Sequence, residues 1–219
     1  MHRTRIKVCG MKQPCQVTAA IKMGVDAIGM IFYGKSPRYV TIKQAKAIRK
    51  VVPAFVNLVG VFVNEDSENI NAIANEVGLD LIQLHGDESA EDAEKLIKPY
   101  LRAIQVKNSD YVTSQIALHK KARGYLLDSY SKTKYGGTGT VFDNQSLPQE
   151  LPESLIVAGG ISLSTVDEIL ALNPYAIDVN SGIEVAPGEK DVEALQKLIA
   201  LVQQHDATPS KVNTLKNQC

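Results

Sequence analysis

Short apolar segments alternate with stretches of helical spacing along almost the whole chain. Each apolar segment is about strand length and rich in β-branched residues, whereas the stretches between them repeat apolar positions every three or four residues. The predicted strands lie near residues 5–9, 26–32, 56–62, 80–84, 101–106, 124–128, 154–158 and 176–180, and the predicted helices near 13–23, 41–51, 67–77, 89–98, 109–121, 163–171 and 190–204.

Eight alternating βα units predict an α/β fold with a parallel sheet, specifically a single (β/α)₈ TIM barrel. An open doubly wound sheet is disfavoured because neither GxGxxG nor GxxxxGK[ST] follows the first strand. No linker divides the chain, so we expect one catalytic barrel over residues 1–205 and a disordered tail over 206–219. Residues 129–153 are rich in Gly, Thr and Pro and read as an active-site loop.

Several helices carry a start signal. Asp66 or Ser67 precedes the third helix, Ser89 with Asp92 opens the fourth, and Ser162 precedes the seventh. These side chains can accept hydrogen bonds from the first free backbone N–H groups of a helix.

Composition narrows the classes of function. The 24 basic and 24 acidic residues give a formal net charge of zero, which argues against a nucleic-acid or membrane partner and requires any anionic substrate to be bound locally. The start of the chain lacks the apolar stretch of a secretory signal, so a cytoplasmic location is expected. The three cysteines show no metal-ligand spacing, and no metal site is predicted.

The first strand places Lys7 and Cys9 on one face, and we expect this face to line the barrel interior. Cys9 is either a small buried apolar residue or a reactive thiol, and a neighbouring ammonium that lowers the thiol pKa favours the second reading. Lys7 itself needs a buried counter-ion. Because strand eight neighbours strand one in a closed barrel, Asp178 is predicted to lie within salt-bridge distance of Lys7.

Polar side chains at other strand ends form a candidate active site. Asp128 ends the sixth strand, so it either caps a helix or faces Cys9 across the barrel mouth as the acid of an acid–base pair. His85 ends the fourth strand and is either structural or part of the site. Arg38, in the second βα loop, is either an ordinary surface residue or a binder of a carboxylate.

Glycines follow the last two strands. Gly159 and Gly160 come after strand seven, and Ser181 with Gly182 comes after strand eight. Barrels commonly bind phosphate between these two loops through backbone N–H groups, so a phosphate site is predicted there. The GGTGT run at 136–140 is either a flap over the same pocket or a plain flexible loop.

Taken together, these segments resemble the phosphoribosylanthranilate isomerase family of tryptophan biosynthesis. The resemblance covers residues 5–205. The matching segments, which occur in family order, are KVCGM at 7–11, SPRYV at 36–40, GVF at 60–62, QLHGDE at 83–88, LLDS at 126–129, YGGTG at 135–139, AGGI at 158–161 and DVNSGIE at 178–184.

The resemblance implies the Amadori rearrangement of N-(5-phosphoribosyl)anthranilate to 1-(2-carboxyphenylamino)-1-deoxyribulose 5-phosphate. It assigns the base to Cys9, the acid to Asp128 and the anthranilate carboxylate to Arg38. His85 and Asp178 would line the substrate site, and the glycine loops would hold the phosphate. No cofactor is expected because the iminium intermediate is its own electron sink. The partner is a small phosphoribosyl substrate, and the protein is expected to be a monomer or homodimer.

Two other functions stay open at this point. Lys7 or Lys107 could form a Schiff base in a lyase or synthase. The glycine loops could also belong to a phosphate-ester binding module without catalysis, although that leaves the pairing of Cys9 with Asp128 unexplained. A thiol base and a carboxylic acid would give kcat/KM a bell-shaped pH dependence, in which partial burial helps Asp128 to keep its proton.

Overall fold

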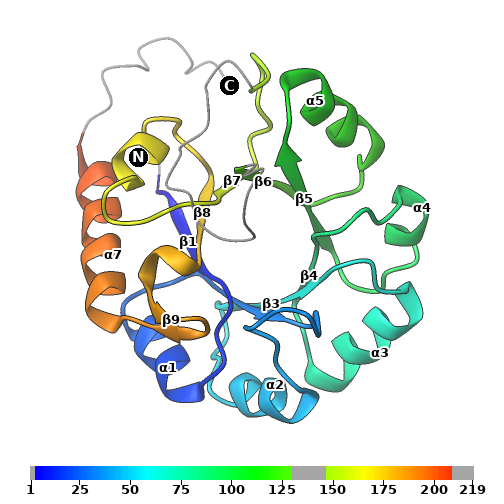
Figure 1. The fold of residues 1–219 in the computed structure, drawn as a ribbon, viewed down its shortest axis with the longest axis horizontal. Coiled ribbons are helices and arrows are strands. Elements are labelled where there is room, and N and C mark those ends of the chain that lie inside the picture. The colour runs from blue at the N-terminus through cyan, green and yellow to red at the C-terminus, as the bar shows by residue number, and fades with distance from the viewer. Residues whose placement is uncertain (1–2, 130–146, 209–219) are drawn as a thin grey trace.

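The computed structural model describes residues 3–129 and 147–208, and its centre is a closed barrel of eight parallel strands in sequence order. Figure 1 looks into the barrel, with the helices in a ring outside the strands. All eight predicted strands are confirmed, at β1 (Arg5–Val8), β2 (Ala27–Ile31), β3 (Asn57–Phe62), β4 (Leu81–Leu84), β5 (Tyr100–Val106), β6 (Gly124–Ser129), β7 (Leu155–Ala158) and β8 (Ala176–Val179).

The helices follow the strands as the sequence pattern predicts. Asp66 is the N-cap of α3, since its carboxylate accepts a hydrogen bond from the Asn69 backbone N–H at 2.8 Å. The helices are α1 (Pro14–Lys22), α2 (Ile42–Arg49), α3 (Ser67–Val77), α4 (Ala90–Ala93), α5 (Ser109–Leu118), α6 (Val166–Leu170) and α7 (Val192–Ala207).

The helices α4 and α6 fall furthest short of their predicted lengths. After α4 the hydrogen bonds tighten to three-residue spacing, as in the bond from Lys95 N to Asp92 O at 3.1 Å, and Pro99 then directly precedes β5. Ser162 was expected to begin the helix after β7, but it forms a turn with Thr165, and α6 begins at Val166. The Thr165 hydroxyl also donates to the Gly160 carbonyl at 2.8 Å, so these side chains hold the loop instead of a helical turn.

The barrel interior divides into an apolar part and a polar part. Leu101, Ala103, Leu126, Ile156, Ala158 and Ala176 form a cluster of their own, separate from the larger core between strands and helices. Leu126 and Ala176 lie two residues before Asp128 and Asp178 on the same strand faces, so the polar residues lie above the apolar layer at the C-terminal ends of the strands.

Further contacts close the fold. The Asp206 carboxylate accepts hydrogen bonds from the backbone and hydroxyl of Thr4, at 2.7 and 2.8 Å, and so joins the end of α7 to the start of β1. The boundary predicted after residue 205 therefore falls inside α7, while tail residues 209–219 and the glycine run at 136–140 lie outside the described residues. Within the described ranges no helix is long and apolar enough to cross a membrane.

A buried ion pair joins β5 to the loop after β4. Arg102 Nη1 lies 2.8 Å from Glu88 Oε2, and both side chains are about 5% exposed. The same carboxylate accepts backbone N–H groups from Asn64 and Gly86, so it also ties the loops after β3 and β4 together. This network fixes the segment that follows His85.

We predict that Glu88→Ala lowers the free energy of unfolding by about 3–5 kcal/mol, because it leaves the Arg102 charge buried without a partner. Urea denaturation measures the change. Glu76→Ala is the matched control, since the Lys46–Glu76 pair is about half exposed and its loss should cost under about 1 kcal/mol. Equal effects of the two substitutions would contradict the prediction.

Candidate active site

Lys7 and Asp178 form a salt bridge inside the barrel mouth, as the sequence predicts. Lys7 Nζ lies 2.7 Å from Asp178 Oδ2, and the side chains are 4% and 6% exposed. The two residues are register partners of β1 and β8, so the closure of the barrel brings them together. Burial alone would lower the pKa of Lys7, but the charge of Asp178 outweighs it and raises the pKa, which keeps the ammonium charged.

Cys9 follows β1 and is buried beside this pair. Gly29 on β2 makes room for it, since a Cβ at Gly29 would lie 2.8 Å from Cys9 Sγ and 3.1 Å from Lys7 Nζ. Lys7 lowers the thiol pKa as expected, but the net shift of that pKa is upward. Burial raises the pKa of Cys9, and the opposing charge of Lys7, itself shared with Asp178, does not compensate.

Asp128 lies at the end of β6 with a side chain 29% exposed, and its partner is His85. The imidazole Nε2 is 3.3 Å from Asp128 Oδ2, while Nδ1 is 2.8 Å from the amide nitrogen of the buried Gln83. If the amide donates to Nδ1, the imidazole proton resides on Nε2 and faces the carboxylate. His85 is therefore part of a polar chain that reaches Asp128 from β4.

The loops after β7 and β8 pack directly against each other. A Cβ at Gly182 would lie 1.9 Å from the Ile161 carbonyl oxygen, so only glycine fits there. Gly159 and Gly160 have φ of 86° and 63°, a region that glycine adopts without strain. Among the described residues, no acceptor is found for the backbone N–H groups of Gly159 and Gly160. The two loops to which the sequence assigns a phosphate are therefore adjacent.

Arg38 is held by two residues that sequence reasoning missed. Its guanidinium pairs with the buried carboxylate of Glu184, with Nη2 2.5 Å from Oε2, and Lys190 Nζ lies 2.7 Å from Oε1. Glu184 and Lys190 belong to the hairpin of β9 (Glu184–Ala186) and β10 (Glu189–Lys190), which follows the short 3₁₀ helix η2 (Ser181–Ile183) after β8. The segment GIEVAPGEK signals a turn but not the burial of its charged residues.

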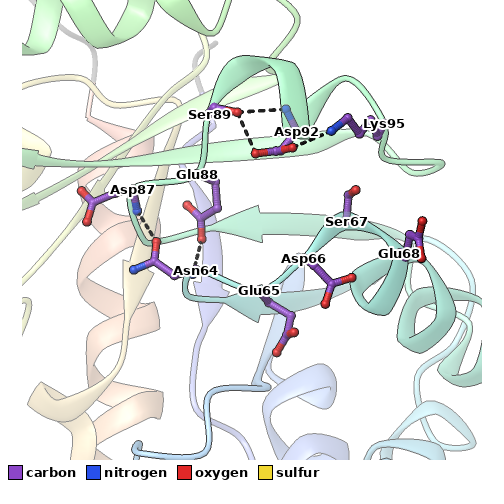
Figure 2. Close-up of a pocket in the computed structure, with 10 residues that line it drawn as sticks. All are labelled: Asn64, Glu65, Asp66, Ser67, Glu68, Asp87, Glu88, Ser89, Asp92 and Lys95. Atoms are coloured by element: carbon purple, nitrogen blue, oxygen red, sulfur yellow. Dashed lines mark hydrogen bonds and ion pairs between the residues drawn. The ribbon is translucent and has the colours of Figure 1, made fainter.

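A separate hollow of about 690 Å³ lies between the loops after β3 and β4 (Figure 2). It is lined mainly by acidic and hydroxyl side chains that bond to one another, such as Asp92 to Ser89 and Lys95. An excess of carboxylates opposes the binding of a phosphate or carboxylate ligand. No cluster of three or more metal-ligating side chains is found in residues 3–129 and 147–208. The candidate site therefore stays at the barrel mouth.

Comparisons with known proteins agree with this geometry. Residues 6–204 match the family described as N-(5'phosphoribosyl)anthranilate (PRA) isomerase. The chain is 41% identical over 204 residues to the N-(5'-phosphoribosyl)anthranilate isomerase of Pseudomonas fluorescens, covering 93% of this chain and 100% of that protein. The corresponding protein of Azotobacter vinelandii is also 41% identical, with coverages of 93% and 99%.

Solved structures show the same likeness. The phosphoribosyl anthranilate isomerase of Thermotoga maritima superposes with a TM-score of 0.81 at 30% identity, over 92% of this chain and 99% of that one. A phosphoribosyl anthranilate isomerase in complex with reduced 1-(o-carboxyphenylamino)-1-deoxyribulose 5-phosphate gives a TM-score of 0.77 at 29% identity, over 92% and 99% of the two chains.

The space beside Gly29 generates a prediction. Gly29→Ala should displace the Cys9 thiol and lower kcat by on the order of 10²-fold, because a shift of about 1 Å in a reacting group has an effect of that size. Gly34→Ala is the control, since a Cβ there meets nothing within 4 Å. Steady-state kinetics with a thermal unfolding curve separates misplacement from misfolding, and wild-type turnover in Gly29→Ala would contradict the packing argument.

Proposed function

The chain belongs to the N-(5′-phosphoribosyl)anthranilate isomerase family, whose Amadori rearrangement in tryptophan biosynthesis it catalyses, and we propose that Cys9 and Asp128 carry the proton transfers. The observation that supports this assignment is the position of a buried thiol after β1 and a partly exposed carboxyl at the end of β6, both at the mouth of one barrel.

The two groups have opposite tasks in this chemistry. Asp128 donates a proton to the ring oxygen of the ribose, which opens the furanose and leaves an iminium at C1. Cys9 then removes the proton from C2, which the iminium has made acidic, and the resulting enol collapses to the ketose. A raised pKa of Cys9 makes the thiolate rare in the free enzyme but a stronger base when it forms.

We propose that His85 is a positioning residue for Asp128. Its Nε2 lies 3.3 Å from the carboxylate, and the buried Gln83 fixes the other ring nitrogen. An imidazole whose Nε2–H faces the carboxylate can orient Asp128, and the 28% and 29% exposure of the two side chains lets solvent restore the proton that Asp128 gives up.

The remaining assignments concern binding. The backbone N–H groups of Gly159 and Gly160, with Ser181 and Gly182 opposite, are proposed to hold the phosphate. Asp178 Oδ2 is bonded to Lys7, but its buried Oδ1 has no partner among the described residues, so we assign it to a substrate hydroxyl.

Arg38 completes the binding assignments, with the anthranilate carboxylate as its ligand.

The other two functions are disfavoured by the surroundings of their key groups. A Schiff-base lysine must lose its proton, whereas Lys7 is held charged by Asp178. Lys107 Nζ lies 4.2 Å from the centre of the Tyr111 ring, so this amine already packs on an aromatic face in a cation–π contact. A pure binding module would not require the Gln83–His85–Asp128 chain.

Oligomeric state and cellular location remain predictions. A homologue from Thermotoga maritima is described as dimeric, which agrees with the homodimer among the two states expected for this chain. The cytoplasmic location is likewise an expectation from sequence.

The function is tested by a coupled assay with chemically generated N-(5-phosphoribosyl)anthranilate and indoleglycerol-phosphate synthase, in EDTA. We predict that Cys9→Ser, Cys9→Ala and Asp128→Asn each lower kcat by about 10²–10⁴ or more, with far smaller changes in the affinity for the reduced product analogue. Cys15→Ser is the control because this exposed thiol lies outside the site. Wild-type-like turnover in either Cys9 variant would remove the thiol from the reaction.

The pH dependence follows from the pKa of Cys9. Two groups that must hold opposite protonation states give a bell-shaped profile of kcat/KM. Because thiols ordinarily titrate above carboxyls and burial raises the pKa of Cys9, the alkaline limb should belong to the thiol and lie above about 8.5. Kinetics and the rate of Cys9 alkylation, both followed against pH in a Cys15→Ser/Cys219→Ser background, measure it. A limb below this value would mean that Lys7 outweighs burial.

A further inference from the structure

The hairpin after β8 contributes two buried charged residues to which the proposed reaction gives no role. Resting on the proposed assignment of Arg38 to the substrate carboxylate, we propose that Glu184 and Lys190 are positioning residues that aim Arg38 and leave the group a net positive charge. We call Arg38, Glu184 and Lys190 the arginine clamp. The clamp would determine affinity for substrates that carry an aromatic carboxylate.

The contacts of the clamp are directional. Arg38 Nε lies 3.0 Å from both carboxylate oxygens of Glu184, and Nη2 lies 2.5 Å from Oε2, so one edge of the guanidinium is fixed. Among the described residues, no acceptor is bonded to the other terminal nitrogen, Nη1. A planar guanidinium held on one edge can still bind a second carboxylate with its remaining donors.

The Lys190 ammonium forms its hydrogen bonds with acceptors of the protein itself. It donates to Glu184 Oε1 at 2.7 Å and to the side chain and backbone oxygens of Asn180 at 2.9 and 3.2 Å. The Lys190 side chain is 1% exposed and that of Glu184 is 4% exposed, and the polar atoms of both are already bonded within the protein, so neither residue is assigned to a ligand. Arg38 is 18% exposed and is the member of the clamp that a ligand can reach.

The charges of the clamp do not cancel. Burial alone would raise the pKa of Glu184, but hydrogen bonds from Arg38 and Lys190 outweigh it and lower the pKa, which keeps the carboxylate ionised. Burial lowers the pKa of Lys190, and its bond to Glu184 opposes that shift. With Lys190 protonated, two cations share one anion at the edge of the barrel mouth. A carboxylate on the substrate would complete the charge balance.

The clamp also lies next to the proposed base. A Cβ at Gly10, the residue after Cys9, would lie 2.7 Å from Arg38 Cδ and 2.8 Å from Asn180 Oδ1. Lys12 reaches the same region, since a Cβ at Gly188 would meet its side chain at 2.4 Å. The loops after β1, β2 and β8 thus meet at Arg38, which sets its distance from the thiol.

The test compares two inhibitors in the coupled assay. They are reduced 1-(2-carboxyphenylamino)-1-deoxyribulose 5-phosphate and the same compound without its carboxyl group. We expect Arg38→Met and Glu184→Gln each to weaken binding of the carboxylated inhibitor by about 10- to 100-fold, and binding of the other by no more than about threefold. KM for substrate should rise more than kcat falls. Glu76→Gln, in an exposed ion pair, is the control and should change neither.

Lys190 supplies a second, independent variant if Glu184→Gln fails to fold. Lys190→Met should weaken the carboxylated inhibitor selectively by about tenfold, and Lys190→Arg, which keeps the charge, should recover most of the loss. Selective loss in these variants supports the proposal. Equal weakening of both inhibitors would overturn it, since it would mean that the clamp only holds the loops together.

The same variants distinguish a failure of positioning by Glu184 and Lys190 from a failure of the carboxylate role of Arg38. If Arg38→Met discriminates between the inhibitors but the Glu184 and Lys190 variants do not, positioning is overturned while the assigned role of Arg38 stands. If Arg38→Met does not discriminate, the carboxylate assignment falls, and the clamp proposal falls with it. The proposed roles of Cys9 and Asp128 in turnover are tested separately by their own variants, and neither result changes that proposal.

Discussion

The closed barrel forces the residues at its mouth to share one small space, and the buried pair of Lys7 and Asp178 depends on that closure. Neither charge would be tolerated there alone, because an unpaired buried ion costs several kcal/mol. The register of β1 and β8 places them side by side, and the pair in turn surrounds Cys9 with fixed charges. The closure of the barrel therefore determines both the ion pair and the charged environment of the Cys9 thiol.

The loops above the barrel are tied together by carboxylates in the same manner. Glu88 joins the loops after β3 and β4 to Arg102, and Glu184 joins the loops after β2 and β8 through Arg38 and Lys190. Each carboxylate receives several donors, so it is satisfied despite its burial. Loops held this way keep reacting and binding groups in place without a bound ligand.

The features that the sequence could predict are those set by the spacing of apolar residues and by the alignment of neighbouring strands. The eight strands follow from blocks of β-branched residues, and the Lys7–Asp178 contact follows from side-chain parity plus the rule that a barrel closes between its first and last strands. The burial of Glu184 and Lys190 does not follow from either, because it depends on the packing of a hairpin against a distant loop. The helices α4 and α6 were predicted too long because turn hydrogen bonds and the Thr165 hydroxyl replace helical ones.

The raised pKa of Cys9 shows why local charge alone is a poor guide to reactivity. Lys7 attracts the thiolate, yet the same ammonium is already paired with Asp178, whose negative charge opposes the thiolate, and burial removes the water that would stabilise the anion. In the proposed reaction the Cys9 thiolate is thus a strong base that is rarely formed before substrate binds. Once the ring of a bound substrate has opened, the iminium adds a positive charge beside the thiolate. The intermediate that needs the base is then also what stabilises the thiolate, so proton removal is favoured after ring opening and not before it.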